Sequence, residues 1–91
     1  MKKIIMDRLG CTAEMAERVE KNLNNISVEL RCFVDKWLES GIVEDTPVYH
    51  GYSVVRLMEQ YGMVFTGAIL TLDWIIKDPD LALKALKEGI R

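Results

Sequence analysis

Residues 12–39, TAEMAERVEKNLNNISVELRCFVDKWLE, carry the pattern that decides how this chain folds. Apolar side chains recur there at alternating intervals of four and three residues, the spacing that gives a helix one apolar stripe. The seam consists of Thr12, Ala16, Val19, Leu23, Ile26, Leu30, Phe33 and Trp37, with Thr12 its one polar member. Because the spacing continues through Asn24-Asn25 without a slip, we predict one long helix over 12–39.

Three shorter helices are predicted after the long one, at 53–61, 64–77 and 79–88. Ser53 is a favourable N-cap and Gly62 a favourable stop for the first of them, and Asp78-Pro79 is a typical start for the last.

The middle helix, 64–77, is apolar on nearly every side, with Leu70 and Trp74 opposite its main apolar face. Such a helix is typical of a buried, central position. Residues 40–52 are predicted as a loop, with a tiny β-hairpin near 42–49 as an alternative. The sequence therefore predicts an all-α fold, a small helical bundle that forms a single domain over 1–91.

The composition excludes several classes of protein. The chain has 91 residues, of which 49% are hydrophobic and 29% charged, and a formal net charge of −2. The charge lacks the basic excess of a protein that binds phosphate backbones. The longest weakly charged stretch, 63–76, is shorter than the roughly 18 residues of a membrane-spanning helix. We expect a cytoplasmic protein that contacts no membrane.

Cysteine and histidine are too few to build a metal centre or a disulfide framework. Cys11 and Cys32 lie about 30 Å apart on one continuous helix, and roughly 12 Å apart if it folds back at Asn24-Asn25. A disulfide requires Cα atoms about 4.4–6.8 Å apart. His50 is the one histidine. We expect two reduced thiols, no metal and no cofactor.

The densest cluster of polar and aromatic side chains is Tyr49, His50 and Tyr52, with Arg56 one turn into the following helix. One interpretation is a small pocket in which His50 titrates near neutral pH. The other is a loop whose rings pack over helix ends while their hydroxyls reach water. The histidine has no placed acid or nucleophile, so no catalytic residue is assigned.

DNA binding is a further hypothesis, because residues 53–75 have the rhythm of a helix-turn-helix. The helix that would read the bases, however, contains no Arg, Lys, Asn or Gln from 64 to 73. Base edges and phosphates are read by such side chains. We therefore do not expect a nucleic-acid partner.

The apolar helix surface is larger than so short a chain readily covers, because a domain of this size has a thin core. The leading hypothesis is thus a non-catalytic interaction or regulatory module that forms a homodimer or binds another helical protein. Its alternatives are a small helix-turn-helix transcriptional regulator and a small enzyme or ligand binder using the 49–52 loop. The expected interaction surface comprises Val19, Leu23, Ile26, Leu30, Phe33, Trp37, Leu70 and Trp74.

Overall fold

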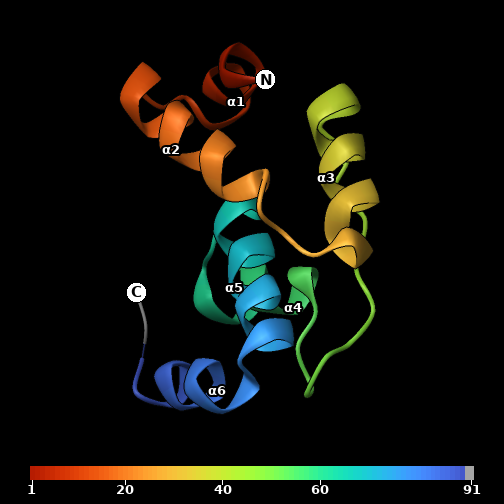
Figure 1. Ribbon diagram of the computed structural model, residues 1–91. Helices are drawn as coiled ribbons and strands as arrows, with labels where there is room; N and C mark the ends of the chain where they lie inside the picture. Colours follow the sequence, from red (N-terminus) through yellow and green to blue (C-terminus); the bar gives the residue numbers. More distant parts are fainter. Residues whose placement is uncertain (90–91) are drawn as a thin grey trace. The chain divides into compact units, whose positions relative to one another are not determined.

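The computed structural model describes residues 1–89, and within them the chain forms six α-helices and no β-strand (Figure 1). The predicted all-α class is confirmed. The helices are α1 (Lys2–Leu9), α2 (Ala13–Leu23), α3 (Val28–Ser40), α4 (Val54–Tyr61), α5 (Phe65–Lys77) and α6 (Pro79–Lys87).

The chain divides into two compact units, Met1–Glu44 with α1 to α3 and Asp45–Arg91 with α4 to α6. The single domain expected over 1–91 stays a prediction. No helix in the described part of the chain is long and apolar enough to cross a membrane.

In the first unit, α1 packs on α2 and α3. This helix was not predicted from the sequence. It is tied to α3 by Arg8, which donates from Nε to the carbonyl of Trp37 at 2.9 Å and from Nη2 to that of Leu38 at 3.1 Å. The guanidinium thus pairs with carbonyls of the last turn of α3, and the Trp37 carbonyl also accepts from the Gly41 amide at 2.9 Å. Gly41 ends α3 in the left-handed region, at φ 73°.

The long helix predicted over 12–39 is wrong, because α2 ends at Leu23 and α3 begins at Val28. Side chains pair with the backbone at the break instead of letting the helix continue. Asn25 donates from Nδ2 to the Lys21 carbonyl at 3.0 Å, and Arg31 donates to the Leu23 carbonyl at 2.7 Å. Asparagine competes in this way with helical hydrogen bonds, and the chain turns where it does so.

The seven-residue spacing survives the break, which is why the sequence pattern misled. The four residues 24–27 take up about one helical turn of sequence, close to 3.6 residues. The apolar side chains that follow them therefore keep the phase of those that precede them. Buried positions still recur at every seventh residue on the two helices, namely Ala16, Leu23, Leu30 and Trp37.

In the second unit, α5 packs on both α4 and α6 (Figure 1). The three short helices are confirmed to within a residue or so of their predicted ends. Ser53 Oγ accepts from the Arg56 amide at 3.3 Å, and Asp78 Oδ1 accepts from the Leu81 amide at 3.4 Å, so both predicted N-caps form. The buried apolar side chains of this unit are Val54, Leu57, Phe65, Ala68, Ile69, Leu72, Ile75, Ala82 and Leu86.

The hairpin predicted near 42–49 is not formed. Asp45 and Thr46 lie within this segment and cap α4: Val54 N–H donates to Thr46 Oγ1 at 2.9 Å and Val55 N–H to Asp45 Oδ1 at 3.2 Å. The first amides of a helix have no acceptor within the helix, so they readily donate to side-chain oxygens. The backbone pairs only later, where Tyr49 and Tyr52 form an isolated bridge.

Candidate functional site

An open pocket of about 740 Å³ lies where α4 ends and α5 begins. Gly62 ends α4 in the left-handed region at φ 67°, and α5 begins three residues later at Phe65. This short connection holds the last turn of α4 beside the first two turns of α5. The volume is in the range of about 300–1,000 Å³ typical of ligand clefts. The residues that line the α4–α5 pocket are Gln60, Tyr61, Gly62, Met63, Val64, Gly67 and Thr71.

The floor of the pocket, by which we mean Met63, Val64, Gly67 and Thr71, is mainly apolar. Val64 is 58% exposed and Met63 is half-buried, so both side chains are accessible beside it. Thr71 contributes a hydroxyl, but Oγ1 donates to the Gly67 carbonyl at 2.8 Å and lies 3.7 Å from the Met63 sulfur. Because that proton is used within the chain, Thr71 offers an entering group its methyl and an acceptor oxygen.

Neither the backbone conformation nor the packing of the helix requires a glycine at position 67. It is the third residue of α5 and has no positive φ, so the backbone does not require glycine there. A Cβ at this position meets only Val64 Cγ2 at 3.9 Å and Met63 Cβ at 4.0 Å, which are ordinary contacts. Glycine costs the interior of a helix about 0.5–1 kcal/mol relative to alanine, and less in the first turn, where Gly67 lies. No close contact around the Cβ position therefore requires a glycine there.

The rim of the pocket is polar and aromatic, and it comprises Gln60 and Tyr61 of the lining together with Arg56 and Tyr52, which contact them. The hydroxyls of Tyr61 and Tyr52 lie 3.4 Å apart, and their ring centroids are 6.3 Å apart. Arg56 Cζ lies 5.8 Å from the centroid of the Tyr52 ring, within the range of a cation–π contact. The same guanidinium donates from Nε to Gln60 Oε1 at 3.4 Å. One cation is thereby held beside the pocket.

Hydrogen bonding within the rim changes the pKa of the Tyr61 hydroxyl. The bond with the Tyr52 hydroxyl, with burial as a smaller cause, raises the pKa of Tyr61 above its usual value of 10.0. The Tyr61 hydroxyl therefore keeps its proton to a higher pH than an isolated tyrosine does.

Of the four pocket candidates predicted from the sequence, the structure brings Tyr52 and Arg56 together. Tyr49 joins them through its backbone, which exchanges hydrogen bonds of 2.7 and 2.9 Å with Tyr52. His50 is exposed in the turn between the two tyrosines, at φ 51°. Sequence reasoning missed Tyr61 and Gly67. The presence of a glycine within an otherwise apolar helix is the signal that could have identified Gly67.

Three of the eight residues of the predicted interaction surface are buried. Leu23, Leu30 and Trp37 are buried by the chain itself, so a partner cannot reach them in this conformation. The other predicted members are half-buried, namely Val19, Ile26, Phe33, Leu70 and Trp74.

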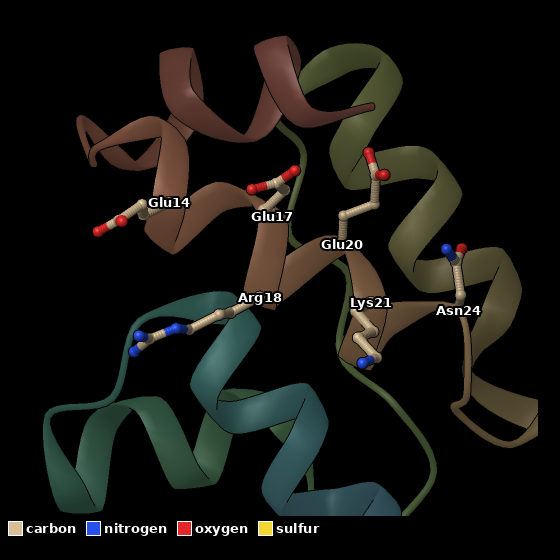
Figure 2. Close-up of a pocket in the computed structure, with 6 residues that line it drawn as sticks. All are labelled: Glu14, Glu17, Arg18, Glu20, Lys21 and Asn24. Atoms are coloured by element: carbon tan, nitrogen blue, oxygen red, sulfur yellow. The ribbon is translucent and has the colours of Figure 1, made fainter.

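A second hollow, of about 580 Å³, runs along α2 and differs in character from the first. It is lined by charged and amide side chains of α2 and its C-cap residue, namely Glu14, Glu17, Arg18, Glu20, Lys21 and Asn24. Figure 2 shows the carboxylates of Glu17 and Glu20 directed away from the cations of Arg18 and Lys21. Mixed charges on one exposed helix are typical of a solvated surface. No group of three or more metal-binding side chains occurs among the described residues.

The α4–α5 arrangement also bears on DNA recognition. Two packed helices joined by a short turn are what the helix-turn-helix hypothesis requires, but a recognition helix must expose its first residues to the bases. Phe65 and Thr66 are buried there. Arg56 is the single basic side chain between Thr46 and Ile76. The geometry therefore favours an apolar pocket over a nucleic-acid interface.

Comparison of the chain with known proteins identified no similar protein. The chain matches no protein-family model, no curated protein and no solved structure.

Proposed function

We propose that the chain is a cytoplasmic, non-catalytic interaction module, and that it binds an apolar side chain of a helical partner in the α4–α5 pocket. The observation that carries this proposal is Gly67. A glycine that costs helix stability, with room for a Cβ and no need of a special backbone angle, is explained by the space it leaves in the pocket floor.

The character of the lining supports binding by burial of apolar surface. An apolar floor with a few polar groups at its edge is typical of sites where one anchoring side chain is inserted and oriented. Here Met63 and Val64 supply the apolar surface, and Gln60 and Tyr61 supply the polar edge. The partner that the sequence analysis favoured, a helical protein or a second copy, presents such side chains.

The pocket is tested with the smallest probe of this chemistry, N-acetyl-leucinamide, added to the isotope-labelled chain while amide chemical shifts are recorded. N-acetyl-glycinamide, which has the same backbone groups and no side chain, is the matched control probe. We expect the leucine probe, at millimolar concentration, to shift amides at 60–64, 67 and 71, and the glycine probe to leave them unchanged.

The same titration is repeated with the variant Gly67→Leu, because the new leucine side chain occupies the space that the probe would fill. We expect this variant to fold and to lose the shifts. Equal shifts from the two probes, or shifts spread over other helices, would show that the pocket does not bind an apolar side chain.

A further inference from the structure

The chain itself carries a side chain of the kind that the α4–α5 pocket accepts. Leu81, in the first turn of α6, is 53% exposed, although its neighbour Ala82 and the later Leu86 are buried. The turn is held by Asp78, whose Oδ1 accepts from the Leu81 amide at 3.4 Å. The backbone of a leucine in a capped helical turn is already ordered, so it loses little conformational freedom when the side chain enters a partner's pocket.

The charges around Leu81 complement those at the rim of the pocket. Asp80 and Lys84 flank the leucine one helical turn apart, in the order negative then positive. On α4, Arg56 and Glu59 are also about one turn apart, in the order positive then negative. All four side chains are exposed, and none of them forms an ion pair within the described residues.

We propose that the partner is a second copy of this chain, with Leu81 of one copy seated in the α4–α5 pocket of the other. In this arrangement α6 of one copy lies parallel to α4 of the other. Asp80 then faces Arg56, and Lys84 faces Glu59. The identification of the partner rests on the proposed function of the pocket.

The contact is reciprocal. In a two-fold symmetric dimer, a residue that contacts a second residue across the interface is itself contacted in the same way, so each pocket receives one leucine. Two pockets and four ion pairs are then formed at once. A closed pair also uses both complementary surfaces, whereas a head-to-tail contact would leave one of each open and continue into longer assemblies.

The first measurement is sedimentation equilibrium of the whole chain from micromolar to millimolar concentration. We expect the mass to rise from 10.4 kDa and to level off at twice that value. Leu81→Ala should weaken the dimer by about tenfold or more, since each of two pockets loses part of a leucine side chain. The matched control is Val28→Ala, which truncates an apolar side chain that is 84% exposed in the other unit.

Charge reversal tests the pairing itself. Arg56→Glu and Asp80→Arg should each weaken the homodimer by about two- to tenfold, because each places like charges opposite one another twice. An equimolar mixture of the two single variants should recover wild-type affinity, since the heterodimer contains one native pair and one reversed pair. Glu39→Arg, an exposed residue of α3, controls for the change in net charge.

Three results would overturn the inference: a monomer at every concentration, a dimer indifferent to Leu81→Ala, or a mixture that associates no better than the separate variants. None of them would remove the pocket, because binding of N-acetyl-leucinamide is measured without self-association. A chain that dimerises through Leu81 but binds no leucine probe would instead count against the proposed function.

Discussion

Gly67→Ala should stabilise this protein and impair its pocket at the same time. Alanine is favoured over glycine by about 1 kcal/mol in a helix interior, and by less in the first turn where Gly67 lies. The new methyl gains two ordinary contacts, at 3.9 Å to Val64 and 4.0 Å to Met63, each worth about 0.1–0.2 kcal/mol. The sum is a gain of about 0.5–1 kcal/mol.

Urea and thermal unfolding followed by far-UV circular dichroism measure this gain. A change of that size raises the midpoint of thermal unfolding by about 2–8 °C in a domain of this length. The same variant should bind N-acetyl-leucinamide more weakly than the wild type, because the methyl occupies part of the pocket floor.

Gly62→Ala is the matched control, since it makes the same chemical change at a glycine that does have a backbone role. Gly62 lies at φ 67°, and a methyl group added there would meet no atom within 4 Å, so the effect is purely conformational. We expect it to destabilise the protein by about 1 kcal/mol. If Gly67→Ala also destabilised it, glycine would be required by the fold, and the argument for a functional pocket would fail.

Three further predictions concern contacts within each unit. Thr46→Val should cost about 1–3 kcal/mol in urea unfolding because it leaves the buried Val54 amide without its acceptor, whereas Thr46→Ser should cost much less. Arg8→Met should cost about 1 kcal/mol, since it removes two hydrogen bonds to carbonyls of α3 while keeping an apolar stem, and amide hydrogen exchange at the end of α3 should quicken. Tyr52→Phe should lower the pKa of Tyr61 towards 10.0 in a titration followed by tyrosinate absorbance. The folded-state pKa of Tyr61 lies above the unfolded value. The stability contributed by this pair is therefore complete below pH 10.0 and is lost as the pH rises through the folded pKa. A Tyr61 titration that is unchanged in Tyr52→Phe would refute the role of the hydrogen bond.

Local signals predicted most of the second unit correctly. Ser53 and Asp78 are N-caps in the sequence and in the structure, and Gly62 stops α4 as expected. These features depend on a few neighbouring residues, since a cap pairs a side chain with amides two or three positions away. Periodicity then identified the apolar face of α5 because that face is buried whatever its partners are.

Local signals failed where two patterns competed. The heptad spacing of 12–39 favoured a continuous helix, while Asn24 and Asn25 favoured a turn. The turn prevailed because its backbone groups find partners in the side chains of Asn25 and Arg31. The hairpin near 42–49 failed similarly, because Asp45 and Thr46 bond to amides of α4 about eight to ten residues away.

The sequence by itself determined the all-α class and the three short helices, since periodicity and caps act over a few residues. Only the tertiary structure decided which apolar residues are available to a partner. It buried Leu23, Leu30 and Trp37 of the predicted surface and left Leu81 exposed. It also formed the α4–α5 pocket around Gly67 and placed Arg56 at its rim. The physical reason is that the exposure of a side chain depends on how helices from distant parts of the sequence pack together.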